Sequence, residues 1–446
     1  MSAIAQVLRE AGCRVQGSDR SDSPTVEMLR RAGIPVFIGH DAGNIGEMER
    51  VVYTRAINPD NPELVAARQA GLPVIERAEM LGRLYDLFEN RVSITGTHGK
   101  TTTSAMVGVI LSRLGFSPTV LIGGEVPDLD GHGSLGVSSI IVSEACEAYS
   151  SFLHLKSSLA IVTNIDVDHL DHYGTFDGVL QGFRGFLENV DSSGTVVAWG
   201  DDRNLIAMRP EIPRIWITYG FSDSCDYRLE ILEENRLGQH FCIITPDAGR
   251  VDVSLPLNGR HFALNAAAAI IAAACLGADY QKAADILKDF RGVARRMELK
   301  GIQSDITVVD DYAHHPTEIE ATLQAALVRF GQSLTVVFQP HLYSRTADLL
   351  DDFAQALLPA PRLVLTDVYS ARELPSAGVE TDALYEVLIQ MGHPDLHYVP
   401  ALQDVPFWLE EHVSPGDTVL TVGAGDVFTA GEQLLRILKT ASRAGR

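Results

Sequence analysis

The stretch RVSITGTHGKTTTSAMVGVIL, Arg91–Leu111, decides the fold, because its parts read in order as a strand, a glycine loop and a helix. The apolar run Val92–Ile94 stops just before Gly96, and Lys100 opens a segment whose apolar residues recur at helical spacing. A loop in this position directs backbone N–H groups and the positive end of the following helix at one point, where an anion can bind. The sequence therefore predicts a phosphate-binding loop between a buried strand and a helix.

This loop departs from the strict phosphate-loop pattern, which requires a glycine where the chain has Ile94. An ordinary strand-to-helix turn is the alternative, but packing gives no reason for a Gly-Lys-Thr sequence at the start of a helix. The Lys100 ammonium would reach the outer phosphates of a nucleotide, and the Thr101 hydroxyl could ligate Mg²⁺. We predict that ATP binds the loop and the first helical turn, which comprise Gly96, Thr97, His98, Gly99, Lys100, Thr101 and Thr102.

The composition is that of a globular protein with several hydrophobic cores. The chain has 446 residues, of which 46% are hydrophobic, and a formal net charge of −22. This negative charge disfavours nucleic acid or an anionic membrane as a partner, and no apolar run approaches the roughly 20 residues that span a bilayer. We expect a cytoplasmic protein, monomeric or homodimeric, that acts on small molecules. The cysteines are widely separated and are expected to be reduced thiols rather than zinc ligands: Cys13, Cys146, Cys225, Cys242 and Cys275.

Predicted strands and helices alternate along nearly the whole chain, which is typical of an α/β protein with mostly parallel sheets. We expect three domains: a Rossmann-like domain at residues 1–88, a central phosphate-loop ATPase domain at 89–295, and a second Rossmann-like domain at 296–446. In the first domain the predicted strand Cys13–Gly17 is followed directly by Ser18 and Asp19. Because sheets of this kind bind ligands at the carboxyl ends of their strands, Ser18 and Asp19 are candidates for binding a substrate.

Two predicted strands of the central domain deliver polar residues to the sheet edge that carries the loop. The strand Ser139–Ser143 ends just before Glu144, and the strand Leu159–Ile165 is followed by an acidic segment that contains His169. Each residue alone is more often a helix cap or a solvated loop residue, but strand ends that converge favour a metal site. Oxygen ligands from Thr101 and Glu144 suit Mg²⁺, whereas a histidine nitrogen is a less usual ligand for this cation.

Three further segments place polar side chains on helices or loops. The segment GRHFALNAAAA, Gly259–Ala269, opens a helix with His261 and Asn265 on one face, where they could contact adenine or lie in a domain seam. The segments VVDDYAHHPTE (308–318) and FQPHLYSRT (338–346) follow consecutive strands of the last domain. Their histidines could indicate zinc, but a neighbouring arginine disfavours a cation and favours bound carboxylates. The candidates in these two loops are Asp311, His315, His341 and Arg345.

Seven motifs in a fixed order resemble those of the Mur ligase family, over the whole chain. They are GTHGKTTT, SFLHL…AIVTNIDVDHLDHYG, GRHFALNA, FRGVARRMELKG, DDYAHHPTEI, FQPHLYSRT and TVGAGDV. The glycine loop is shared by all Mur-type ligases and by folylpolyglutamate synthases, whereas the last three motifs are typical of the alanine-adding member. The resemblance implies the three-domain Mur ligase architecture, with the first strand of the first domain missing from this chain.

The activity that the resemblance implies is ATP-dependent amide formation in peptidoglycan synthesis. The lactyl carboxylate of UDP-N-acetylmuramate attacks the γ-phosphate of ATP to give an acyl phosphate, and the amine of L-alanine then displaces phosphate. By similarity, the catalytic residues are Lys100, Glu144 and His169, and Mg²⁺ is held by Thr101, Glu144 and His169. The resemblance also implies that His261 and Asn265 face the adenine and Asp311 the ribose. His315, His341 and Arg345 would hold substrate carboxylates.

This sequence departs from the family pattern in two places. Residues 144–149 read EACEAY where many members read EADESD, so Glu144 is kept. We expect the loss of Glu147 to reduce Mg²⁺-dependent activity much less than the loss of Glu144. The family also carries a strand and a glycine-rich turn before the residues that match Met1 and Ser2, and these contribute to UDP binding. We expect a start upstream of Met1 rather than a damaged UDP site, and we expect the chain as written to bind the UDP substrate poorly.

Two other functions stay open on the sequence. One is a recycling ligase of the same family, which attaches a whole peptide in place of alanine; the motif FQPHLYSRT argues against it. The other is a nucleotide-binding protein without ligase activity. A binding measurement with UDP-N-acetylmuramate would distinguish them, because the alanine ligase and the recycling ligase should bind it and the protein without ligase activity should not.

Overall fold

The computed structural model describes residues 1–129, 131–247, 249–371, 373 and 381–444. These residues form two compact units. Unit 1 comprises Met1–Glu230, Phe241–Val253 and Leu264–Arg291, and unit 2 comprises Ile231–His240, Ser254–Ala263 and Gly292–Arg446. The division into three domains at residues 88 and 295 stays a prediction. No described helix is both long and apolar enough to cross a membrane.

The first 88 residues contain four short strands in two separate parallel pairs. The strands are β1 (Gly17–Asp19) with β2 (Val36–Ile38), and β3 (Val51–Tyr53) with β4 (Val74–Glu76). The helices are α1 (Ser2–Glu10), α2 (Pro24–Arg31), α3 (Pro62–Gln69) and α4 (Arg77–Tyr85). Pro24 and Pro62 occupy first helical positions, behind the side-chain caps Ser23 and Asn61.

The predicted strand at Cys13–Gly17 is wrong in its position. The amide of Cys13 donates to the carbonyl of Leu8, so this residue still closes helix α1, and the ladder begins only where Gly17 donates to Pro35. Among the described strands, β1 has β2 as its one hydrogen-bonded neighbour. The other edge of β1 is therefore unpaired among the described strands.

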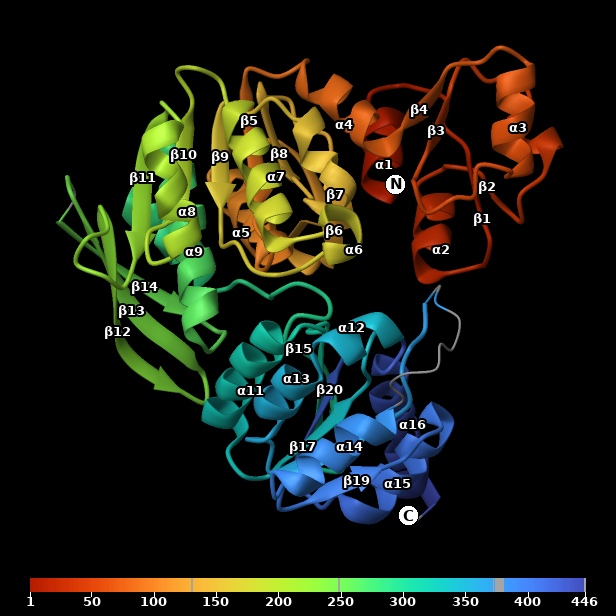
Figure 1. Ribbon diagram of the computed structural model, residues 1–446, viewed down its shortest axis with the longest axis vertical. Coiled ribbons are helices and arrows are strands. Elements are labelled where there is room, and N and C mark those ends of the chain that lie inside the picture. The colour runs from red at the N-terminus through yellow and green to blue at the C-terminus, as the bar shows by residue number, and fades with distance from the viewer. Residues whose placement is uncertain (130, 248, 372, 374–380, 445–446) are drawn as a thin grey trace. The chain divides into compact units, whose positions relative to one another are not determined.

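The phosphate-loop segment lies in a ten-stranded sheet of order β14-β13-β12-β11-β10-β9-β5-β8-β6-β7. The strands are β5 (Asn90–Thr95), β6 (Thr119–Val126), β7 (Gly131–Ser134), β8 (Ile140–Glu144), β9 (Leu159–Val162), β10 (Thr195–Trp199), β11 (Ile215–Gly220), β12 (Tyr227–Asn235), β13 (Gly238–Thr245) and β14 (Gly249–Leu255). The helices that accompany them are α5 (Lys100–Arg113), α6 (Leu170–Tyr173), α7 (Phe176–Glu188), α8 (Arg203–Met208), α9 (Arg260–Cys275) and α10 (Tyr280–Leu287). Figure 1 shows β5 between β8 and β9, with helix α7 beside these strands.

Burial explains why the central strands are almost continuously apolar. The side chains of Val92, Ile94, Ile141, Ile161 and Val162 are all fully buried. A parallel sheet covered by helices buries both of its faces, so its strands lack the alternation of half-exposed strands. Burying one such side chain contributes about 1.5–3 kcal/mol, which fixes the sheet that positions the loops at its edge.

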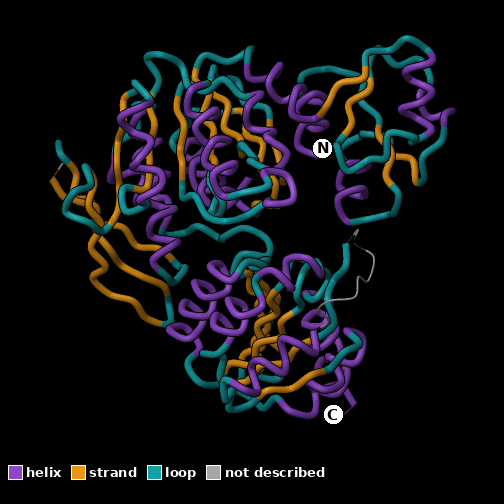
Figure 2. The backbone as a smooth tube through the Cα atoms, in the orientation of Figure 1, coloured by secondary structure: helices purple, strands orange, loops and turns teal. Residues whose placement is uncertain are grey.

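Unit 2 contains a six-stranded sheet of order β15-β16-β20-β17-β18-β19, parallel except for the pair β15–β16. Its strands are β15 (Glu298–Gln303), β16 (Ile306–Asp311), β17 (Leu334–Phe338), β18 (Arg362–Leu365), β19 (Leu396–Tyr398) and β20 (Thr418–Val422). Its helices are α11 (Pro316–Phe330), α12 (Tyr343–Asp348), α13 (Leu350–Leu357), α14 (Thr381–Gln390), α15 (Val405–His412) and α16 (Phe428–Ala444). Figure 2 shows these helices bordering the strands of the sheet.

Candidate functional site

Three strand ends meet at the edge of the unit 1 sheet, as expected from the sequence. Strand β5 pairs in parallel with β8, which places Ile94 opposite Glu144, and with β9, which places Thr95 opposite Val162. The loops that follow β5, β8 and β9 are therefore neighbours. They carry Lys100, Glu144 and His169 respectively.

The loop between β5 and α5 contains two glycines that no other residue could replace without strain. Gly96 has φ 131°, and an added Cβ atom would lie 2.0 Å from Oγ1 of Thr163. Gly99 has φ 84°, and an added Cβ atom would lie 2.7 Å from Oδ1 of Asn265. Both positions combine left-handed backbone with close approach, which is how glycine-rich loops bring backbone N–H groups to a phosphate.

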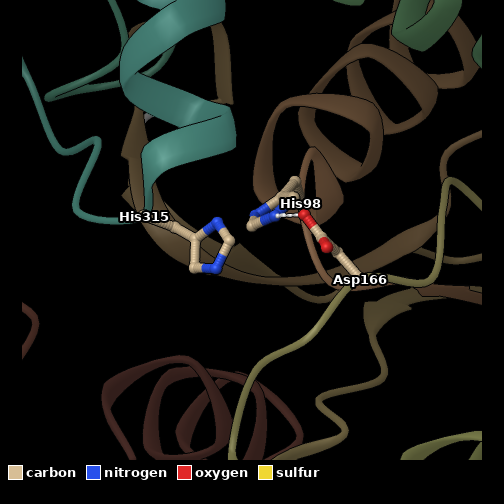
Figure 3. Close-up of side chains that lie close together, drawn as sticks. All are labelled: His98, Asp166 and His315. Atoms are coloured by element: carbon tan, nitrogen blue, oxygen red, sulfur yellow. Dashed lines mark hydrogen bonds and ion pairs between the residues drawn. The ribbon is translucent and has the colours of Figure 1, made fainter. Parts of the chain in front are cut away.

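Hydrogen bonds fix this loop to the end of β9. The amide of His98 donates to Oδ1 of Asn164 at 2.8 Å, Oγ1 of Thr163 donates to the carbonyl of His98 at 2.5 Å, and the amide of Asp166 donates to Oγ1 of Thr97 at 2.9 Å. Figure 3 shows the ring of His98 and the carboxylate of Asp166 pointing toward one another. Nε2 of His98 lies 3.1 Å from Oδ2 of Asp166. The loop shape is thus set by side chains of a neighbouring strand end.

The Lys100 ammonium lies inside this loop. Its Nζ atom donates to the carbonyls of Gly96 at 2.5 Å and Thr97 at 2.9 Å, and to Oε1 of Glu147 at 2.9 Å. Burial lowers the pKa of Lys100, but the neighbouring negative groups, Glu147 chief among them, together outweigh burial and hold that pKa above its usual value. Lys100 is therefore a charged group at the start of α5.

Glu147, for which the sequence predicted a minor role, lies in contact with Lys100. Only 3% of its side chain is exposed, and its Oε1 atom also lies 3.5 Å from Nε2 of His169. Burial raises the pKa of Glu147, but Lys100 and His169 outweigh burial and hold that pKa below its usual value. The expectation that Glu147 matters little rested on its distance from the strand end, and the contact with Lys100 removes that argument. Its spacing, three residues after Glu144 in an acidic motif, is the signal that could have found it.

The proposed metal ligands lie around the same strand ends. Oε1 of Glu144 accepts a hydrogen bond from the amide of Gly123 at 2.8 Å, and its carboxylate is only partly buried. His169 has left-handed backbone with φ 54°, just before helix α6, and contact with Glu147 holds the pKa of its imidazole above the usual value, although burial lowers it. Thr101 is partly buried in the first turn of α5. Among the described residues Oε2 of Glu147 has no hydrogen-bond partner, so this acidic, oxygen-rich site fits a hard cation such as Mg²⁺.

The two residues expected near the adenine lie on helix α9. Asn265 is 7% exposed and packs against Gly99, so it borders the loop. Burial, reinforced by the charge of Arg296, lowers the pKa of His261 to about 4, so His261 is neutral at pH 7. A neutral imidazole is suited to a hydrogen bond with a base and not to a charge contact with phosphate.

The candidates in unit 2 follow strands β16 and β17. Asp311 ends β16, is 3% exposed, and accepts hydrogen bonds from the amides of Met297 and Ala313, both at 2.8 Å. His315 is the N-cap of α11 and accepts from the amide of Thr317 at 3.4 Å. Both residues therefore also stabilise the fold.

His341 follows β17, and its ring lies 5.7 Å from that of Tyr369 in a stacked arrangement. Burial lowers the pKa of His341 to about 4, and the charge of Arg345, in α12, acts in the same direction. His341 is consequently a neutral hydrogen-bonding group at pH 7, and the permanent positive charge of this loop belongs to Arg345.

Ser18 lies within a polar cluster at the carboxyl end of β1. Its hydroxyl donates to Oε2 of Glu63 at 2.6 Å and lies 3.1 Å from Nδ1 of His40. Asp19 ends the same strand, is exposed, and accepts from the amide of Ser21 at 3.2 Å. Both residues lie near the carboxyl end of a strand, as expected, and their role in binding a substrate stays a prediction.

Comparisons with known proteins agree with this architecture. Family models match in three segments: the Mur ligase family, catalytic domain, at residues 1–89, the Mur ligase middle domain at 94–273, and the Mur ligase, glutamate ligase domain, at 295–425. A UDP-N-acetylmuramate--L-alanine ligase of Myxococcus xanthus is 42% identical over 444 residues, which cover 100% of this chain and 94% of that protein.

Solved structures give the same result. The crystal structure of UDP-N-acetylmuramate-alanine ligase from Thermotoga maritima has a TM-score of 0.85 and 30% identity, and the match covers 99% of this chain and 97% of that one. A murein peptide ligase of Psychrobacter arcticus has a TM-score of 0.72 at 23% identity, over 98% of this chain and 96% of that one, and shows the fold alone. The chain belongs to the Mur ligase family.

Proposed function

We propose that this chain is an ATP-dependent amide ligase that joins L-alanine to the lactyl carboxylate of UDP-N-acetylmuramate in the cytoplasm, with release of ADP and phosphate. The observation that carries the proposal is the pairing of β5 with β8, which puts the Lys100 loop beside Glu144. Full-length identity of 42% with an alanine ligase supports the choice of substrates.

In the first step a carboxylate oxygen of UDP-N-acetylmuramate attacks the γ-phosphorus of ATP, and the bond from that phosphorus to the β-phosphate oxygen breaks. The N–H groups at the start of α5 bind the phosphates, and Lys100 neutralises charge that develops on the transferring phosphoryl group. Thr101, Glu144 and His169 would hold Mg²⁺, which would supply further neutralisation of the phosphate charge when bound. Asn265 and His261 would contact the adenine, and Asp311 the ribose.

In the second step the amine of L-alanine attacks the acyl carbon, and phosphate leaves from the tetrahedral intermediate. The chain contributes chiefly by orienting the two reactants, since most of the barrier reduction in such a step comes from positioning. Arg345, with His315 and the neutral imidazole of His341, would hold substrate carboxylates. Ser18 and Asp19 would bind the UDP substrate within residues 1–88, and residues 296–446 would form the amino-acid domain.

The test is ADP release by the purified chain with ATP, Mg²⁺, UDP-N-acetylmuramate and one amine at a time. We expect release with L-alanine and little with the tripeptide that a recycling ligase would use. Faster turnover with the tripeptide would favour the recycling ligase. ATP binding without turnover on either amine, together with no binding of UDP-N-acetylmuramate, would leave a nucleotide-binding protein without ligase activity.

A further inference from the structure

All three hydrogens of the Lys100 ammonium are engaged by the protein itself. The acceptors are the carbonyls of Gly96 and Thr97 and Oε1 of Glu147, at 2.5, 2.9 and 2.9 Å. An ammonium group has three donors and no more. Lys100 must therefore give up at least one of these bonds before it can donate to a nucleotide phosphate.

Glu147 is the one charged partner among the three. Its carboxylate is buried, its Oε1 atom lies between Nζ of Lys100 and Nε2 of His169, and its Oε2 atom has no hydrogen-bond partner among the described residues. A negatively charged oxygen thus occupies the space between a group expected to bind phosphate and a group expected to bind metal. An anionic phosphate oxygen has the same charge and the same preferred partner.

The backbone around Glu147 holds this carboxylate in place. The carbonyl of Glu147 accepts from the hydroxyl of Tyr173 at 2.6 Å and from the amide of Ser150 at 2.9 Å. Tyr149 and Ser150 both adopt left-handed backbone, with φ 53° and 56°, which costs energy for residues other than glycine. The turn that directs Glu147 into the loop is therefore a constrained feature of the fold.

We propose that Glu147 is an internal counter-ion of the phosphate loop, which pairs with Lys100 in the nucleotide-free protein and competes with nucleotide phosphates for that lysine. This inference rests on the proposed function, because it assumes that the loop binds a nucleotide. Glu147 acts through Lys100 and is a positioning residue. It keeps the buried lysine paired while the site is empty, and it makes nucleotide binding weaker than the loop alone would allow.

The experiment compares wild type with Glu147→Gln in binding ADP with EDTA present, by calorimetry. Glutamine keeps the shape of the side chain and removes the charge, so the lysine of the variant lacks its counter-ion. We expect ADP to bind E147Q roughly tenfold more tightly, the change that about 1.4 kcal/mol produces. Adenosine, which has no phosphate, should bind both proteins equally. E147Q should also show a lower Tm without ligand and a larger rise in Tm with ADP.

Glu188→Gln is the control, because it removes one negative charge at an exposed position of α7, outside the phosphate loop. Its metal-free ADP affinity should change far less than that of E147Q. If E147Q does not fold, Glu147→Asp keeps the charge but withdraws it from Nζ, and should tighten ADP binding by a smaller factor.

Unchanged or weaker ADP binding by a folded Glu147 variant would overturn the counter-ion role, provided wild type binds ADP. An equal gain for adenosine would also overturn it, because the effect would then not involve phosphate. If neither wild type nor any variant binds ADP, the phosphate loop itself is misassigned, and the proposed function fails together with this inference.

Discussion

The amide group of Asn265 packs against Gly99, so closely that an added Cβ atom on the glycine would lie 2.7 Å from Oδ1 of the asparagine. The two residues are far apart in the sequence: Gly99 is the N-cap of helix α5, and Asn265 lies in the second turn of α9. Asn265 is 7% exposed. The phosphate loop is therefore shaped by a helix that follows the strands of the sheet, as well as by the strands themselves.

Gly99→Ala should weaken both folding and nucleotide binding. The substitution imposes left-handed strain of about 1–2 kcal/mol and a clash with Asn265 that adds about 1–3 kcal/mol. Gly115→Ala is a matched control, because Gly115 has the same φ of 84° but has no heavy atom within 4 Å of an added Cβ atom. Urea unfolding and ADP calorimetry on both variants measure the difference. If Gly99→Ala and Gly115→Ala are destabilised equally, the side chain of Asn265 moves away from the added methyl group without measurable cost.

Lys100→Met should reduce turnover by roughly two to three orders of magnitude, because it removes a charge that stabilises the transferring phosphoryl group. It should also destabilise the protein by about 3–5 kcal/mol, since Glu147 is left buried without its partner. The double variant Lys100→Met, Glu147→Gln should regain stability in urea unfolding without regaining turnover. A double variant with normal turnover would exclude a catalytic role for Lys100.

Glu144→Ala should raise the Mg²⁺ concentration needed for half-maximal ADP release, because a carboxylate at the edge of the sheet is lost. Titration of Mg²⁺ at saturating ATP measures this shift. Glu188→Gln, at the exposed last residue of α7, is the control and should leave the titration unchanged. The same Mg²⁺ dependence in Glu144→Ala and wild type would remove Glu144 from the metal site.

The stability of the protein should depend on pH through His341. Its pKa is lowered to about 4 in the folded protein, first by burial and then by Arg345, whereas the unfolded chain has the usual value of 6.5. Between pH 6.5 and 4 the unfolded chain therefore binds more protons at this residue, and stability falls as the pH falls. Compared with wild type, His341→Gln should lose less stability between pH 7 and 5 in urea unfolding. Parallel pH profiles for the two proteins would show that His341 does not titrate in this way.

Local signals in the sequence predicted the elements that carry the site. Pro316 begins helix α11 and Gly331 ends it, and strands β17 and β20 are short apolar runs, so local sequence signals account for these elements. The convergence of the loops after β5, β8 and β9 followed from the general behaviour of parallel sheets. The family resemblance supplied the roles of individual residues, which the residues alone left open.

The contact between Glu147 and Lys100 could not be predicted from the sequence. The backbone next to Glu147 adopts conformations that its residue types rarely take. Glu147, which contacts Lys100, is followed closely by Tyr149 and Ser150 in left-handed conformations, and neither residue type signals such a turn. The pair His98–Asp166 also joins side chains from two loops whose spacing is set only in the folded sheet. The predicted strand begins too early, because the amide of Cys13 donates to Leu8 and so still belongs to the end of helix α1. A pattern of apolar residues does not show where the hydrogen bonds of the helix end.

The pairing of Lys100 with Glu147 has a kinetic consequence. The lysine charge is balanced inside the loop, in a chain whose formal net charge is −22, so it provides little long-range attraction for a polyanion in solution. The attraction left at the start of α5 comes from backbone N–H dipoles, which act only over the first turn. The net negative charge of the chain should therefore repel a nucleotide at long range, so its association rate should rise as added salt screens that repulsion.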